Sequence, residues 1–159
     1  MKNSTSWFAL CLAVVLSAGC ATSSSQNNQL IPEPLDPIIA RPDGAVRVDT
    51  GIAEVARLWA ASETAREQGQ AEVALELLYE ALEIDGSNSL LWSRAAELQL
   101  DVVEPALAEK YAMRSNTSAS ENRQLLYRNW LIIEHARSMR GDLLGVRSAR
   151  KQVQLYRYQ

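Results

Sequence analysis

The sequence predicts an all-α fold after an unstructured N-terminal segment. From residue 52 onward Ala, Leu, Glu, Gln and Arg dominate, and all five favour helices. Apolar positions recur three and four residues apart, as in Val73, Leu77 and Leu78. No alternation of apolar and polar residues is long enough to indicate a strand.

The N-terminus has the pattern of an export signal. Lys2 is followed by an apolar run over residues 7–16 and by small residues at 17–19. This run is shorter than the roughly 20 residues that a membrane-spanning helix needs. We therefore expect residues 1–19 to be a signal peptide.

The two cysteines sharpen this expectation. Cys11 lies inside the apolar run, so Cys20 alone would remain and no internal disulfide could form. The stretch Leu16–Cys20 resembles the lipobox of bacterial lipoproteins, although Ser17 stands where that family usually has leucine. The resemblance implies that Cys20 is acylated and anchors the chain. Because Ala21 follows it, and not Asp, the resemblance also implies the periplasmic face of the outer membrane. An ordinary secretory signal is the alternative.

Residues 20–51 should form a flexible linker behind that anchor. Residues 23–29 are a polar run of Ser, Gln and Asn, and four prolines follow between Pro32 and Pro42. Such a composition favours an extended, unstructured spacer. A docking motif at Ile31–Leu35 is the alternative.

Residues 52–159 contain an internal period. Trp92 follows Leu58 at a spacing of about 34 residues, and Trp130 follows Trp92 after a slightly longer interval. Gly69 follows Leu58 at the same distance at which Gly141 follows Trp130. These residues resemble the tetratricopeptide repeat, a helix-turn-helix unit of about 34 residues. The resemblance implies about three tetratricopeptide-like antiparallel helix pairs, six helices in all, and a generic helical bundle is the alternative.

The three repeats match this pattern unequally. Repeat one, residues 55–88, has Gly69 in its turn, whereas the turn of repeat two lacks glycine and places Pro105 at the start of the next helix. The third repeat is the least typical and could equally be a terminal cap. We expect residues 115–121 to form the loop before it, with Ser118 or Ser120 capping its first helix.

Composition excludes several classes of function. The net charge of −3 argues against a general nucleic-acid binder. A single histidine, His135, together with a lipid-modified cysteine leaves no groups for a nucleophilic triad or for a His- or Cys-rich metal site. We therefore expect a protein that is not an enzyme and needs no cofactor.

Stacked helix pairs usually bind partners on the concave surface formed by the first helix of each pair. The repeat resemblance implies which side chains line that groove. They are Trp59, Glu63, Arg66, Leu90, Ser93, Glu97, Leu100, Arg128, Leu131 and His135. Their mixture of aromatic, aliphatic and charged groups suits a peptide segment or helix of another envelope protein. Trp59 as a core residue is the alternative to Trp59 as a groove residue.

The charge is unevenly distributed. From residue 123 onward basic residues greatly outnumber acidic ones, whereas the preceding part of the mature chain is acidic. The basic end comprises Arg137, Arg140, Arg147, Arg150 and Lys151. It could contact anionic cell-wall polymer, or it could pack against the acidic repeats of the same or a neighbouring molecule.

These observations predict a lipid-anchored, periplasm-facing adaptor or assembly factor that holds a segment of another envelope protein. One alternative is a structural lipoprotein that contacts peptidoglycan through its basic C-terminal repeat. Another is a pilotin-like factor for pilus or secretin assembly.

Overall fold

The computed structural model describes residues 51–119 and 122–157, and in these residues every regular element is a helix. The predicted signal peptide, Cys20 and nearly all of the predicted linker lie outside the described residues. The helices are α2 (Ala53–Glu67), α3 (Ala71–Ile84), α4 (Ser89–Asp101), α5 (Pro105–Ser118), α6 (Arg123–Met139) and α7 (Leu143–Arg157).

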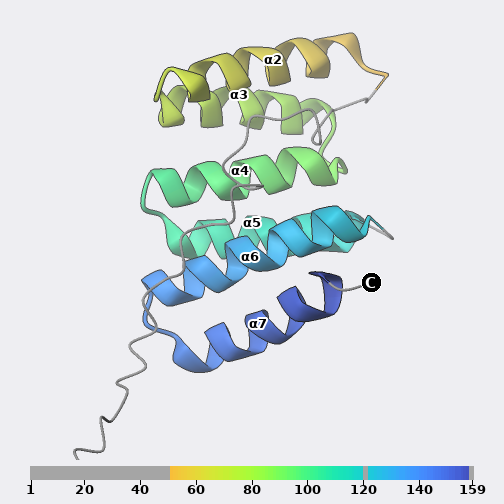
Figure 1. Ribbon diagram of the computed structural model, residues 1–159. Coiled ribbons are helices and arrows are strands. Elements are labelled where there is room, and N and C mark those ends of the chain that lie inside the picture. Colours follow the sequence, from red (N-terminus) through yellow and green to blue (C-terminus); the bar gives the residue numbers. More distant parts are fainter. Residues whose placement is uncertain (1–50, 120–121, 158–159) are drawn as a thin grey trace, which may run out of the picture.

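Consecutive helices form three antiparallel pairs, α2 with α3, α4 with α5 and α6 with α7, and the pairs stack in chain order (Figure 1). Each pair packs against the next through α3 with α4 and through α5 with α6, and α4 also contacts α6 directly. The prediction of an all-α fold of helix pairs is confirmed.

The turn inside each pair has the same backbone geometry. Gly69, Val103 and Gly141 each have a positive φ, of 74°, 61° and 71°. In each turn the next residue donates its backbone N–H back to a carbonyl of the preceding helix, as Glu104 does to Gln99 at 2.7 Å. This bond satisfies one of the carbonyls that a helix end leaves without a partner. The turn without glycine thus has the shape of the other two, and Pro105 begins α5 as predicted.

Helix α4 lies between two apolar cores. Leu91, Ala95 and Leu98 belong to the core formed with α2 and α3, whereas Ala96 and Leu100 belong to the core formed with α5, α6 and α7. All eight residues from 93 to 100 are buried. Because α4 is covered on more than one face, its polar residues need partners inside the protein.

The loop predicted over residues 115–121 is wrong in its first part. Helix α5 continues to Ser118, and the cap of α6 is Asn122, whose side chain accepts a hydrogen bond from the Leu125 N–H at 3.0 Å. Ser115 is buried, and its Oγ donates to the Ser89 carbonyl at 2.7 Å and accepts from Asn129 Nδ2 at 2.7 Å. These bonds hold a polar stretch in the helix. Ser120, the other predicted cap, lies outside the described residues.

Crossing a membrane demands a helix that is both long and strongly apolar. Among residues 51–119 and 122–157 no helix meets both conditions.

Candidate functional site

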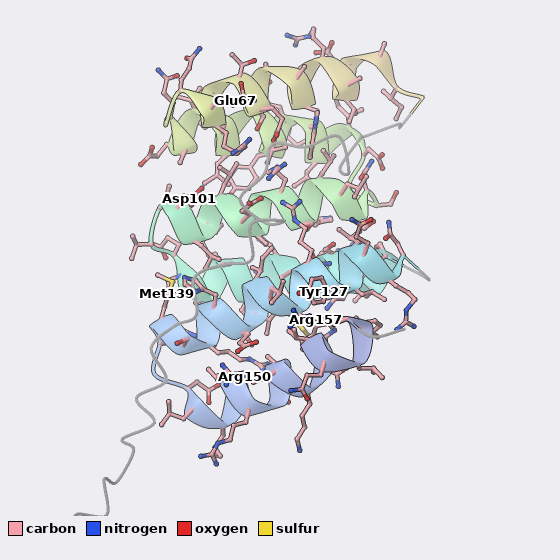
Figure 2. The ribbon with its side chains drawn as sticks, viewed as in Figure 1. Glu67, Asp101, Tyr127, Met139, Arg150 and Arg157 are labelled. Carbon is pink, nitrogen blue, oxygen red and sulfur yellow. The ribbon has the colours of Figure 1, made fainter. Side chains whose placement is uncertain are left out.

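The first helices of the three pairs, α2, α4 and α6, carry the residues predicted to line a binding surface. Their last residues, Glu67, Asp101 and Met139, lie on the same side of the stack (Figure 2), so the three helices run in the same direction. Side chains one repeat apart can therefore meet across neighbouring pairs. We call the surface formed by these helices the α2–α4–α6 face.

Arg94 of α4 lies at the centre of this face and is fully buried. Its Nε lies 2.8 Å from Glu63 Oε1, and its Nη2 donates to Glu63 Oε2 at 3.1 Å. These two contacts join α2 to α4, the first helices of two successive pairs. The Nη2–Oε2 contact is a hydrogen bond, whereas the Nε–Oε1 contact is an ion-pair contact without hydrogen-bond geometry.

Glu97 continues the contact from α4 to α6. One oxygen of its buried carboxylate, Oε2, accepts from both Arg94 Nη1 and Arg128 Nη2. Glu63, Arg94, Glu97 and Arg128 therefore form one continuous chain of ion pairs, which we call the charge ladder. It links all three helix pairs through side chains that are largely removed from water.

Burial and charge act in opposite directions on Glu97. Burial raises the pKa of its carboxyl group above the ordinary value, while the neighbouring guanidinium groups of Arg128 and Arg94 lower it. The net direction is upward. An unpaired carboxylate in this position would be far more costly, which makes the two arginines essential partners of Glu97.

Trp59 lies where the ladder meets the first core. Its ring packs against that core, and the Arg94 guanidinium carbon lies 5.6 Å from the ring centroid. This is a cation–π distance. Trp59 was expected to be either a core residue or a groove residue. Its half-buried side chain has features of both, because it contacts the first core and also Arg94 of the charge ladder.

Arg66 lies in the last turn of α2, next to Glu63 of the charge ladder. Its Nη2 lies 3.4 Å from Glu63 Oε2, a weak contact, and its buried Nε has no hydrogen-bond partner in the described residues. Arg66 thus has donor capacity that the described part of the protein does not use.

The remaining predicted residues divide into two groups. Ser93 and Leu100 are buried, and Leu100 belongs to the second core, so these two do not form a free surface. Leu90, Leu131 and His135 are partly exposed.

His135 marks the end of the ladder pattern. It precedes Gly141 by the same interval at which Glu63 precedes Gly69 and Glu97 precedes Val103. A histidine thus occupies the place where the other two first helices have a carboxylate. Burial lowers its pKa below the ordinary value, and Glu134 opposes that effect.

The predicted basic end is partly neutralised. Arg137 Nε donates to Glu109 at 2.8 Å, and Arg140 pairs with the other oxygen of the same carboxylate. Arg150 Nε donates to Glu134 Oε1 at 2.8 Å. Three of the five basic residues are thus paired inside the molecule.

On α7, Arg147 and Lys151 are exposed and form no ion pair within the part of the chain that the structure describes. These two are therefore the free charges of the predicted basic end. They are available to an anionic partner from outside the molecule.

Arg94 is the residue of this face that the sequence analysis missed. A signal for it exists, because the interval between Glu63 and Arg94 recurs between Glu97 and Arg128. A glutamate and an arginine that repeat with the period of the helix pairs are placed to pair across successive pairs.

The described residues contain no group of three or more His, Cys, Asp or Glu side chains that could hold a metal ion. The charges of the ladder are paired with one another, so the face offers a partner mainly apolar contact from its partly exposed residues. Comparison of the chain with protein-family models, with curated proteins and with solved structures finds no match.

Proposed function

We propose that this protein is a non-enzymatic adaptor of the bacterial cell envelope. It is held to the periplasmic face of the outer membrane by acyl chains on Cys20, and its α2–α4–α6 face holds a segment of another envelope protein. The observation that carries the proposal is the charge ladder. It fixes the three first helices in one continuous surface, as recognition of an extended segment requires.

The chemistry of the face favours an apolar segment with one acceptor group. The ladder charges are already paired, so they contribute rigidity more than attraction. Trp59, Leu90 and Leu131 are partly exposed and offer apolar and aromatic contact. Arg66, whose side chain is 15% exposed, adds a positive charge that favours an acceptor group in the partner.

The anchor is tested by Cys20→Ser in the full chain. Two or more acyl chains bind a membrane firmly, so loss of the acylated residue should move the protein from the membrane fraction to the soluble fraction. A variant that stays in the membrane fraction would show that the lipobox interpretation is wrong.

The binding face is tested by placing a photo-crosslinking residue at Leu90 or Leu131 of the full chain. Both positions should give an adduct with the same envelope protein. A matched control is Met113, an exposed residue of α5 that lies outside this face. The same adduct from the control position, or no adduct from either face position, would contradict the proposal. A pilus or secretin subunit in the adduct would identify the adaptor as a pilotin-like factor.

The second candidate is a structural contact with peptidoglycan, which the free charges of Arg147 and Lys151 favour. Isolated sacculi should then sediment with the full chain but not with the variant Arg147→Glu, Lys151→Glu. Binding that survives this double reversal would exclude the candidate. Adducts from Leu90 and Leu131 should be unaffected, because α7 lies outside the face on which they stand.

A further inference from the structure

Two exposed strips on opposite ends of the stack have the same spacing and opposite charge. On α3 the strip is Val73, Glu76, Glu80 and Ile84, and on α7 it is Leu144, Arg147, Lys151 and Leu155. In both strips the residues follow the first one by three, seven and eleven positions, which places them on one face of a helix. The pair that contains α3 and the pair that contains α7 lie at the two ends of the stack (Figure 1).

The apolar ends of both strips are exposed. Val73 and Ile84 are 45% and 47% exposed, and Leu144 and Leu155 are 77% and 47% exposed. Single apolar side chains at a surface are ordinary, but here two of them flank two charges on each helix. Each strip therefore offers a partner both apolar contact at its two ends and charge at its centre.

The charged centres form no direct ion pair in the described residues. Neither Glu76 and Glu80 on α3 nor Arg147 and Lys151 on α7 form one within that part of the chain. Glu80 has only a longer-range electrostatic interaction with Arg57. Helix α3 contains four glutamates and no basic residue, whereas α7 contains four basic residues and no acidic one. Within one copy the two helices do not pack against each other. Their complementarity is therefore not used inside the molecule.

We infer that the α3 strip of one copy docks on the α7 strip of a second copy of this chain. In a parallel register the apolar and charged positions of the two strips match one to one. In an antiparallel register each glutamate lies within one residue, about 1.5 Å of helix rise, of a basic partner. Charge complementarity of this kind selects the partner and fixes the register, while the apolar ends remove surface from water.

The inference is independent of the proposed binding face, because neither strip lies on α2, α4 or α6. An adaptor that self-associates through α3 and α7 would keep that face available in every copy. Several copies on one membrane could then hold several segments of the same partner, which raises the overall affinity.

The test uses two differently tagged full-length copies expressed in the same cells and purified in mild detergent. Wild-type copies should co-purify. The acidic-strip variant Glu76→Lys, Glu80→Lys should self-associate at least about tenfold more weakly, since like charges then face each other. The basic-strip variant Arg147→Glu, Lys151→Glu should lose association to the same extent.

The decisive sample mixes the two variants. Each reversed strip then meets a strip of opposite charge on the other copy, so association between the two variants should return to the wild-type level. This recovery also shows that both variants are folded. A matched control is Lys110→Glu, Arg114→Glu, which reverses two exposed charges of α5 and should leave association unchanged.

Other outcomes overturn the inference. The inference fails if wild-type copies do not co-purify. It also fails if each strip variant self-associates as well as the wild type. Loss of sacculus binding by the basic-strip variant, with self-association intact, would assign the α7 strip to the cell wall. For the wild type, association should weaken as ionic strength rises from about 0.05 to about 0.5 M, because salt screens exposed charges. A salt-independent association would contradict the role of these four charges.

Discussion

Val103 adopts, between α4 and α5, the left-handed backbone conformation that Gly69 adopts between α2 and α3. The two residues are one repeat apart and have φ values of 61° and 74°. Glycine reaches this region freely, whereas a β-branched residue meets steric resistance there. The repeat geometry is thus kept at a position where the sequence does not favour it.

We expect Val103→Gly to stabilise the protein. Val103 is 68% exposed, so its side chain contributes little burial, and the strain relieved exceeds the entropy that glycine adds to the unfolded chain. The free energy of unfolding in urea should rise by about 0.5–1 kcal/mol. Gly141→Val is the converse change. No atom lies within 4 Å of the Cβ that it adds, so any loss would come from the backbone alone. A decrease for Val103→Gly would contradict the argument.

The charge ladder makes Glu97 a much more sensitive residue than an exposed acid. Glu97→Gln keeps the shape of the side chain but removes the charge that Arg94 and Arg128 share. Breaking a buried pair typically costs about 3 kcal/mol or more, and we expect a loss of that size in urea denaturation. The control is Glu54→Gln, which removes an exposed pair with Arg57 and should have no measurable effect. Equal behaviour of the two variants would show that the ladder does not hold the pairs together.

The ladder also shows where prediction from sequence reaches its limit. Gly69, Gly141 and Pro105 located the turns, because each acts through local backbone geometry. The rotation of α4 about its axis could not be predicted from the local pattern, because α4 faces two cores and most of its residues are buried. That rotation decides that Arg94 is buried and points toward Glu63 and Glu97.

The prediction that the loop before α6 begins at Ser115 was wrong for a related reason. The polar run after Arg114 has no apolar period, and such runs are usually loops. Ser115 is helical because Ser89 and Asn129, both distant in sequence, supply its hydrogen-bond partners. Tertiary contacts of this kind override local preference and cannot be predicted from neighbouring residues.

His135 predicts a specific pH dependence of stability. Burial holds its folded-state pKa below the ordinary value of 6.5, so the unfolded chain takes up a proton first as the pH falls. The unfolded state then binds more protons than the folded state, and the free energy of unfolding decreases on acidification through that window. The stabilisation is therefore present above about pH 6.5 and is lost below it.

Between about pH 7.5 and about pH 5.5, acidification should lower the free energy of unfolding of His135→Gln less than that of the wild type. Urea denaturation at each pH measures this difference. His135 is the single histidine of the chain, so no other imidazole contributes to the difference. The effect should be modest because the side chain is only half-buried. Parallel pH profiles for the two proteins would show that His135 titrates alike in the folded and unfolded states.

Gly145 is the position where a usual rule for helices should reverse. It lies in the first turn of α7, where alanine is normally more stable than glycine by roughly 1 kcal/mol. Here the Gly145 N–H donates to Asp142 Oδ1 at 2.8 Å, and an added Cβ would overlap the Asp142 carboxylate and lie 2.8 Å from Arg137 Cδ. Gly145→Ala should therefore displace the carboxylate that caps α7, and its net effect should be destabilising.

A double-mutant cycle separates these opposing effects. In an Asp142→Ala background the cap is already absent and the space beside Gly145 is open, so Gly145→Ala should lose most of its cost and approach the usual gain of a helical alanine. The sign of the substitution should thus differ between the two backgrounds in thermal or urea denaturation. If Gly145→Ala stabilises the protein in both, the Asp142 carboxylate does not occupy the space beside Gly145, and the cap that begins α7 must be formed in another way.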